Sequence, residues 1–367
     1  MRVLYVATSY PSDNLDWRGI FIKHLAAALA RQPGLQLSAW TPPGPYPDSV
    51  EYCATEQEAS WLQALMDDGG IAHIIRSHPV AALPRVGGLI GRLRALYRRT
   101  NEVNLYHLNW LQTAIPLPST HTPAVITVLG TDLRLLSLPM ARRALRRAMK
   151  DRPVAICPNA EWMVDSLRDS FGDLAQIVPV PFGIDDRWYR VTRCTNTSSP
   201  LWLVVSRLTK DKLGPLIEWS EQLFAGTSRE LHLIGPMQER ISLPDWITYH
   251  GPASADSLRN EWFPKAHGLI TLSQHAEGRP QVMLEAMASG LPIVASGISA
   301  HRDFLEPGAS GILCKNRVSY HAAVVDLENE EKNHAMGVKA RAWAAKNIGT
   351  WDDCARRYLS VYHELGL

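Results

Sequence analysis

The chain has 367 residues, with 38 Lys and Arg against 36 Asp and Glu, and a formal net charge of +2 at pH 7. This near-neutral balance gives no support for nucleic-acid binding through bulk charge, and 46% hydrophobic residues supply ample material for a core. The length suggests about two domains.

The five cysteines are scattered and form no Cys-x-x-Cys pair, which predicts reduced thiols in a cytoplasmic protein. The apolar run at the N-terminus is too short for a signal peptide. No apolar stretch approaches the roughly 18 to 20 residues that span a bilayer. We therefore expect a cytoplasmic protein whose membrane contact, where it exists, is peripheral.

Strand-like and helix-like runs alternate along nearly the whole chain, which is typical of parallel sheets with crossover helices. In the first half the pattern predicts helices at 20–31, 142–150 and 160–171, and strands at 3–7, 36–40, 104–108, 124–128, 154–157 and 177–180. The polar segment TRCTNTSSP at 192–200 ends in Pro200 and predicts a linker.

The second half restarts the same pattern, with strands predicted at 201–205, 231–234, 247–250, 269–272, 293–295 and 311–313. Two doubly wound α/β domains with a ligand cleft between them are the most economical architecture. We place the domains at 1–191 and 201–350. The closing helix within 351–367 fits either domain, and a return to the N-terminal domain is one option.

The stretch HAEGRPQVMLEAMASGLPIVAS, from His275 to Ser296, contains two carboxylates eight positions apart, Glu277 and Glu285. A helix is predicted from near Pro280 to Gly290. The preceding loop and the helix N-terminus form a usual place for an anionic ligand. On a helical path the two carboxylates would be on the order of 12 Å apart, which suits two ends of an extended ligand better than one metal ion. Alternatively, Glu277 caps the helix and Glu285 is a solvated surface residue.

Two cations follow the strand at 201–205, in the segment SRLTKDK. Arg207 offers a fork of donors and Lys212 a mobile point charge, a pair suited to a diphosphate. The alternative is that both side chains are simply solvated.

Further candidates lie at predicted strand ends of the first half. Gly19 precedes a helix and would let backbone N–H groups approach a phosphate or sugar, while the absence of Gly-x-Gly-x-x-Gly argues against a nicotinamide cofactor. Asp132 in TVLGTD and His107 and Asn109 in YHLNW are each able to bind a sugar hydroxyl. Each is equally able to cap a helix or satisfy a buried backbone group.

Together these segments resemble retaining glycosyltransferases of the GT-B fold, family four, over most of the chain. The resemblance rests on EGRPQVMLEAMASGLPIVAS, VSRLTKDK, the Gly19 loop, NAEWMVDSL, and VPVPFGID at 178–185. It implies a GT-B architecture, with two Rossmann-like domains facing across a cleft. The first domain would lie on the acceptor side, and the second would bind the nucleotide sugar.

The resemblance also implies roles for individual residues. Glu277 would face the transferred sugar as a catalytic residue, Glu285 would bind the ribose hydroxyls, and the basic pair would hold the diphosphate. Other donor contacts would come from Gly19 and from the backbone of Gly278, Arg279, Pro280, Gln281 and Val282. The family's usual histidine is replaced by Leu129, so Asp132 and His107 are the remaining catalytic candidates. No Asp-x-Asp ends a strand, so we expect neither metal nor cofactor.

Basic residues gather in two acid-free runs of the first half. One holds Arg76, Arg85, Arg92, Arg94, Arg98 and Arg99; the other holds Arg134, Arg142, Arg143, Arg146, Arg147 and Lys150. The segment MARRALRRAMK resembles a basic amphipathic helix that rests on anionic lipid. This favours a lipid-diphosphate-linked or oligosaccharide acceptor at the inner membrane face, against the alternative of two solvated helix faces.

The sequence thus predicts a retaining hexosyltransferase of exopolysaccharide, biofilm or lipopolysaccharide assembly. The exopolysaccharide analogy favours GDP-mannose over UDP-glucose as donor. Two alternatives share the fold: a nucleotide-sugar 2-epimerase, which would turn over donor without acceptor, and a non-catalytic relative, which would bind donor and release no nucleotide.

Overall fold

The structure is a computed structural model that describes residues 1–13, 16–71, 74, 79–100, 102–194, 198–275, 277–305 and 310–367. The chain forms two compact units. Unit 1 comprises Met1–Gly183 and Trp351–Leu367, and unit 2 comprises Ile184–Thr350. The division falls before the expected linker at 192–200, of which residues 195–197 lie outside the described part. Trp188 is already buried in the core of unit 2, which explains the earlier boundary.

Unit 1 is built on a parallel sheet with the strand order β3-β2-β1-β4-β5-β6-β7. The order reverses between β1 and β4, which makes their carboxyl ends the topological switch point. The strands are β1 Arg2–Val6, β2 Gln36–Trp40, β3 Val50–Tyr52, β4 Leu105–Asn109, β5 Ala124–Val128, β6 Val154–Pro158 and β7 Gln176–Ile177.

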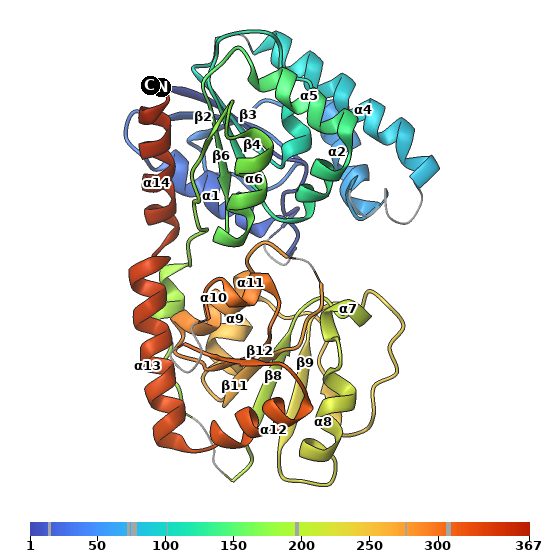
Figure 1. Ribbon diagram of the computed structural model, residues 1–367, viewed down its shortest axis with the longest axis vertical. Helices are drawn as coiled ribbons and strands as arrows, with labels where there is room; N and C mark the ends of the chain where they lie inside the picture. Colours follow the sequence, from blue (N-terminus) through green and yellow to red (C-terminus); the bar gives the residue numbers. More distant parts are fainter. Residues whose placement is uncertain are drawn as a thin grey trace. The chain divides into compact units, whose positions relative to one another are not determined.

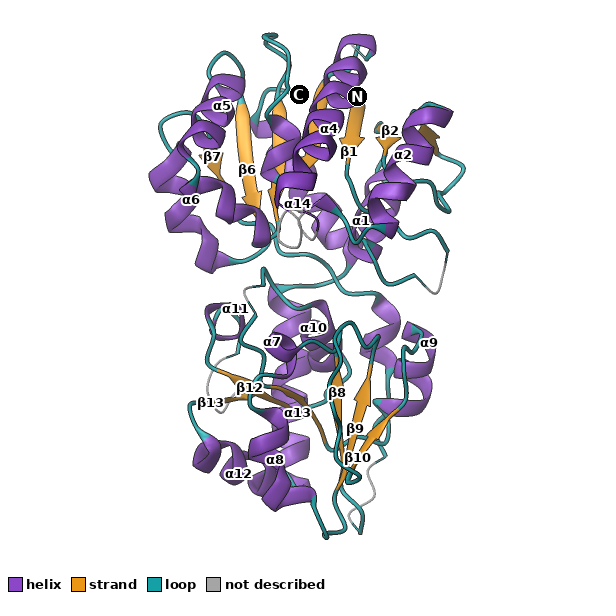
Figure 2. Cartoon of the chain, turned by 90° about the vertical axis from the view of Figure 1, so that its right-hand side faces the viewer, coloured by secondary structure: helices purple, strands orange, loops and turns teal. Residues whose placement is uncertain are grey.

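Helices cover both faces of this sheet (Figures 1 and 2). They are α1 Ile20–Ala30, α2 Glu56–Asp67, α4 Pro79–Arg99, α5 Pro139–Met149, α6 Val164–Phe171 and α14 Trp351–Glu364, with short turns η1 Leu111–Ala114, η2 Thr131–Ser137 and η3 Glu161–Met163. One core layer joins the sheet to α1 and α14, and another joins it to α4, α5 and α6. Burial on both faces explains why the central strands read as continuous apolar runs.

Helix α14 is fastened to unit 1 by buried aromatic residues. Tyr358 and Tyr362 are fully buried in the same core layer as α1. Their hydroxyls share hydrogen bonds with Thr127 of β5, at 2.7 Å, and with His107 of β4, respectively. Because each buried polar group has a partner, the aromatic rings are buried without an unsatisfied hydroxyl.

Unit 2 repeats the doubly wound plan, with the parallel strand order β10-β9-β8-β11-β12-β13. Its strands are β8 Leu201–Val205, β9 Glu230–Ile234, β10 Ile247–Tyr249, β11 Gly268–Thr271, β12 Ile293–Ser296 and β13 Ile312–Cys314. Its helices are α7 Lys210–Leu213, α8 Leu216–Phe224, α9 Ala255–Ser257, α10 Gln281–Ala288, α11 Ser299–Arg302, α12 Arg317–Asp326 and α13 Glu330–Asn347, with η4 Asp186–Arg190 and η5 Leu258–Trp262. The switch point lies between β8 and β11.

The predicted pattern of two doubly wound domains is confirmed, with differences at particular elements. The sequence missed β3, α2 and α4. Helix α4 contains Pro84 and three glycines, which break the helical signal although the segment packs as a helix. The strand expected at 177–180 shortens to Gln176–Ile177, although the backbone N–H groups of Val178 and Val180 still donate to the carbonyl oxygens of Ile156 and Pro158.

No helix in the described ranges is both long and apolar enough to cross a bilayer.

Gly214 offers a test of how closely α7 must approach β11. An added Cβ at Gly214 (φ +53°) would lie 2.2 Å from the Leu272 carbonyl oxygen, whereas Gly226 (φ +69°) has no atom within 4 Å of that position. We predict that Gly226→Ala costs about 1 kcal/mol of unfolding free energy, from the strained backbone alone. Gly214→Ala should cost about 3 kcal/mol or more, because a clash with backbone is added. Urea unfolding measures both, and equal losses would contradict the close approach.

Candidate functional site

Three of the predicted site residues lie at the switch point of unit 2. Strands β8 and β11 are neighbours, so the loops that leave their carboxyl ends lie side by side. Arg207 and Lys212 follow β8, and Glu277 follows β11. Thr209 caps α7 by accepting a hydrogen bond from the Lys212 backbone N–H at 3.2 Å, which fixes the start of this short helix.

An ion pair joins the two loops, between Lys212 Nζ and Glu277 Oε1. Only 11% and 15% of these side chains are exposed, so the pair is largely removed from water. Burial lowers the pKa of Lys212, and the Glu277 charge opposes this effect. Ser273 Oγ donates a further hydrogen bond to Glu277 Oε1 at 3.3 Å. The carboxylate is therefore held in place by partners from both loops.

A buried histidine that sequence reasoning missed supports this arrangement. His301 Nδ1 lies 2.9 Å from the Ser296 carbonyl oxygen and 3.2 Å from Ser296 Oγ, so Nδ1 is the nitrogen that donates. Ser296 Oγ in turn donates to the Ser273 carbonyl oxygen at 2.5 Å. Burial lowers the pKa of His301. A chain of hydrogen bonds thus runs from α11 to Ser273, the residue that contacts Glu277.

Helix α10 begins just after Glu277. Pro280 is its N-cap residue, and no side chain caps its first turn. An uncapped helix N-terminus presents backbone N–H groups and a partial positive charge to an anion. The Arg279 side chain is directed elsewhere, since it forms a buried ion pair with Asp303 and lies 5.7 Å from the Phe304 ring. The N-terminus of α10 is thus left without a side-chain cap, and the donor contacts expected from residues 278–282 stay a prediction.

Glu285 lies further along α10 in different surroundings. Its carboxyl has no hydrogen-bond donor among the residues that the structure describes. Burial raises its pKa to about 8, the nearby Asp185 adds to this, and Arg259 opposes it. Neither alternative drawn from the sequence fits: Glu277 does not cap α10, and Glu285 is partly buried rather than fully solvated.

Gly19 occupies the switch point of unit 1, after β1. Its φ is +67°, and an added Cβ would lie 2.7 Å from Ser9 Oγ and 2.8 Å from Tyr10 N. The glycine therefore allows the N-terminus of α1 to contact the loop backbone after β1. In this structure, Gly19 is required because that loop packs closely against the start of α1.

Asp132 is buried in unit 1, and the catalytic role expected for it stays a prediction. The side chain is buried, and its two carboxylate oxygens accept hydrogen bonds from the backbone N–H groups of Leu111, at 3.0 Å, and Leu129, at 3.1 Å. Burial raises its pKa to about 6, against the effect of these hydrogen bonds. Asp132 thus ties the loops after β4 and β5 together.

His107 is likewise buried in the core of unit 1. It has no exposed surface, and its Nε2 lies 3.0 Å from Thr127 Oγ1 while Nδ1 contacts the Tyr362 hydroxyl. Burial lowers its pKa to about 3, so the ring is neutral. Both ring nitrogens are thus engaged inside the core, and the catalytic role expected for His107 stays a prediction. Asn109 similarly donates to the Val6 carbonyl oxygen, at 3.0 Å.

Trp110, directly after β4, is a further residue that sequence reasoning missed. Its φ of +69° is strained for a bulky side chain, and its ring packs edge-on against Phe21. Such strain gathers at functional loops, and here it lies at the switch point of unit 1. No sequence pattern signals it.

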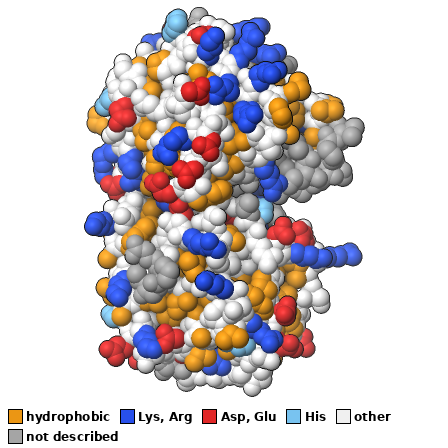
Figure 3. Space-filling model, in the orientation of Figure 1, with side chains coloured by type: hydrophobic (Ala, Val, Ile, Leu, Met, Phe, Trp, Pro, Cys, Tyr) orange, Lys and Arg blue, Asp and Glu red, His pale blue; other side chains and the backbone are white. Residues whose placement is uncertain are grey.

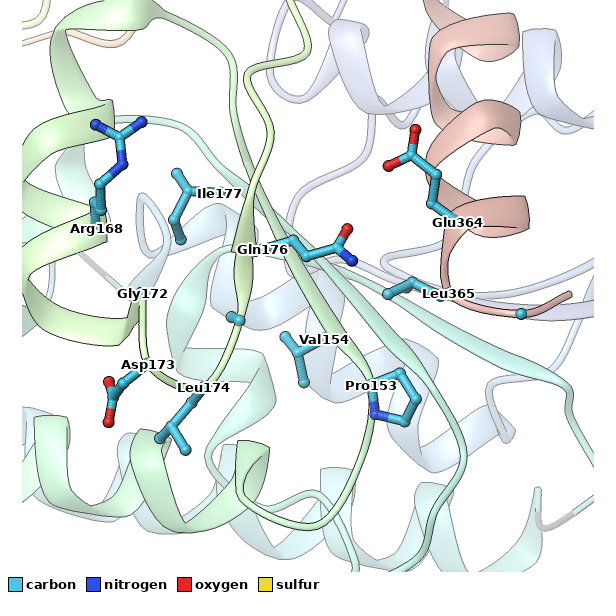
Figure 4. A pocket seen from close by; sticks show the side chains of 12 residues that line it. Pro153, Val154, Arg168, Gly172, Asp173, Leu174, Gln176, Ile177, Glu364 and Leu365 are labelled. Atoms are coloured by element: carbon cyan, nitrogen blue, oxygen red, sulfur yellow. The ribbon is translucent and has the colours of Figure 1, made fainter.

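A hollow of about 720 Å³ in unit 1 lies away from these residues (Figure 4). It surrounds the amino ends of β6 and β7, with Arg168 on one side and Glu364 on the other, whereas the candidate residues follow carboxyl ends. Within the described ranges, no group of three or more His, Cys, Asp or Glu side chains is placed to hold a metal ion.

One segment of the chain matches a known protein family. Residues 199–330 match the family described as Glycosyl transferases group 1. Spore coat protein SA of Bacillus subtilis (strain 168) is 28% identical over 144 residues, a match that covers 37% of this chain and 35% of that protein. This chain therefore matches about a third of that relative's length. The matched family segment includes Arg207, Lys212, Glu277 and Glu285.

Solved structures resemble the whole chain. Sucrose-phosphate synthase from Thermosynechococcus elongatus has a TM-score of 0.73 at 15% identity, covering 100% of this chain and 99% of that one. HepE from Anabaena, in complex with UDP and glucose, has a TM-score of 0.65 at 14% identity, covering 99% and 100%. A glycosyltransferase from Rickettsia africae scores 0.68 at 12%, covering 99% and 98%. The GT-B architecture expected from the sequence is thereby confirmed, and residues 199–330 match the glycosyltransferase group 1 family.

Proposed function

We propose that this protein is a retaining glycosyltransferase that moves a hexose from a nucleotide sugar to a glycan or lipid-linked acceptor. The observation that carries the proposal is the arrangement at the switch point of unit 2. There, two cations, a fixed carboxylate and an uncapped helix N-terminus occur together within the segment that matches the group 1 family. This is the chemistry that an anionic diphosphate with an attached sugar requires.

In the proposed reaction, the bond between the anomeric carbon and the diphosphate oxygen breaks, and an acceptor oxygen bonds to that carbon. The acceptor proton leaves with the nucleoside diphosphate. Arg207 and Lys212 would stabilise the negative charge on the departing diphosphate, and Glu277 the positive character of the sugar. At ~4 Å and an effective dielectric near 20, each charge pair contributes about 4 kcal/mol before desolvation. Glu285 would bind the ribose hydroxyls.

Two nucleotide sugars are candidate donors for the proposed reaction. The exopolysaccharide analogy favours GDP-mannose, whereas the Anabaena HepE structures solved with UDP-glucose favour that donor. Neither choice depends on the charge arrangement above, because both donors carry a diphosphate.

A thermal-shift panel of GDP, UDP, ADP, TDP and their sugars tests donor binding. We predict that one base family raises the melting temperature by roughly 5 to 10 °C near 100 times its Kd. Glu285→Ala and Arg207→Ala should abolish the shift, because each removes a proposed donor contact. The matched control is Arg240→Ala, which removes an exposed arginine outside the proposed site and should keep the shift. A full shift in the two site variants would refute the placement of the nucleotide.

Transfer itself is tested with Glu277→Gln, measured as nucleotide released in the presence of acceptor. We predict a loss of about 10²-fold or more in kcat with nucleotide binding retained, since a neutral amide cannot stabilise developing positive charge.

We also propose metal-independent transfer, because Arg207 and Lys212 would take the metal's role. Full wild-type activity in excess chelator is the expected result, and rescue only by a divalent ion would contradict it. Donor turnover without acceptor would instead indicate an epimerase.

We further propose a cytoplasmic enzyme that contacts the inner face of an anionic membrane through α5. At the start of α5, Met140 is 86% exposed and Leu138 is 53% exposed, beside the exposed Arg142 and Arg143. Apolar residues flanked by arginines are suited to the boundary between headgroups and acyl chains. Lys and Arg side chains gather over α4 and α5 at the upper right of Figure 3. Arg76, of the first basic run, lies outside the described residues.

Vesicle flotation tests this surface. We predict that the wild type floats with vesicles containing phosphatidylglycerol at low salt and not with neutral phosphatidylcholine. Leu138→Ser/Met140→Ser should reduce binding several-fold, because less apolar area is buried. The matched control is Val325→Ser/Val338→Ser, which removes two exposed valines of unit 2 and should leave binding unchanged. Equal binding to neutral vesicles would remove the membrane proposal.

A further inference from the structure

A second hollow in unit 1, of about 230 Å³, lies between α4, α5 and the segment 115–119. It is separate from the group 1 segment, and none of the residues discussed for the donor lines it. Three of its lining residues are arginines and one is an acid. The lining consists of Arg94, Ile115, Pro116, Leu117, Pro118, Ser119, Ala144, Arg147, Ala148, Asp151 and Arg152.

Arg152 forms the buried wall of this pocket. It is 7% exposed, and its guanidinium donates to the carbonyl oxygens of Ala148 and Thr122, each at 3.0 Å, and of Pro118. In the described part of the chain no carboxylate forms an ion pair with it. Carbonyl partners fix the orientation of the guanidinium, and the neighbouring Asp151 carboxylate favours its charge without forming an ion pair with it. A buried cation of this kind favours a nearby anion.

Arg94 of α4 and Arg147 of α5 face the same pocket. Other arginines on these helices are neutralised: Arg99 pairs with Glu58 at 2.6 Å, and Arg146 pairs with Asp173. Among the described residues, neither Arg94 nor Arg147 has an ion pair or a side-chain hydrogen bond. The nearby acids Glu58 and Asp173 thus pair with other arginines. Arg94 and Arg147 face the pocket together with Arg152.

We propose that this pocket binds a phosphoryl group. Three arginines and Asp151 leave an excess of two positive charges, which matches the roughly −1.5 to −2 charge of a phosphate monoester at pH 7. Guanidinium forks suit phosphate oxygens, and the Ser119 hydroxyl adds a donor at the rim. The group has two possible sources, a free phosphate or diphosphate and the headgroup of a lipid. The proposal does not depend on the proposed glycosyl transfer.

The test uses the full chain carrying Arg207→Ala, so that the proposed donor site does not contribute to anion binding. Melting temperature is titrated with inorganic phosphate and pyrophosphate, and flotation is measured with vesicles that contain phosphatidic acid. In this background Arg94→Gln/Arg147→Gln alters the pocket. The matched control, Arg98→Gln/Lys150→Gln, removes equal charge from exposed positions at the C-terminal ends of the same two helices, outside the pocket and away from the start of α5.

We expect the pocket pair to weaken the affinity for at least one probe by about tenfold or more, and the control pair to change it by less than about threefold. Loss confined to soluble anions identifies a free phosphate, and loss confined to vesicles identifies a lipid headgroup; both support the pocket. Equal losses of affinity in the pocket pair and the control pair would show bulk charge attraction and overturn the pocket proposal. A wild-type pocket that binds none of the probes would overturn it as well. Because Arg94 and Arg147 are exposed, both double variants should melt normally without anion.

Discussion

The ion pair between Lys212 and Glu277 is the interaction on which the arrangement of unit 2 depends. It connects the loops that leave two neighbouring strands, and the close approach of Gly214 to the backbone of β11 brings those loops within reach. A pair so far removed from water gains stability only when other hydrogen bonds support its charges. Ser273 supplies one to the carboxylate, and Ser296 and His301 hold Ser273 in turn. Removing either charge would leave the other buried and uncompensated.

Sequence reasoning succeeded where local pattern decides structure. The ends of β8 and β11 and the start of α10 follow from short apolar runs and a proline, so the placement of Lys212 and Glu277 could be predicted. It did not show which polar side chains are buried. The partner of His107 is Tyr362, 255 positions away, and Asp132 accepts from Leu111, 21 positions away. No spacing rule reveals that such polar side chains point into a core.

The two basic runs show the same limit. In sequence they are uniform stretches of positive charge, whereas in the fold their members have different roles. Arg85 and Arg99 pair with Asp68 and Glu58 and attach α4 to the preceding segments. Arg92 lies 4.4 Å from the centre of the Trp61 ring. Only the tertiary structure separates arginines that stabilise the fold from those left to meet an external anion.

Helix α14 gives unit 1 a particular order of assembly during synthesis. The ribosome makes residues 184–350 as one uninterrupted stretch, so unit 2 is able to fold as soon as that stretch has emerged. Unit 1 must wait, because Trp351, Tyr358 and Tyr362 complete its core and are made after unit 2. Until then a face of its sheet lacks its cover, and the nascent chain exposes apolar surface. Residues 1–183 are thus translated before unit 2 and yet reach their final packing after it.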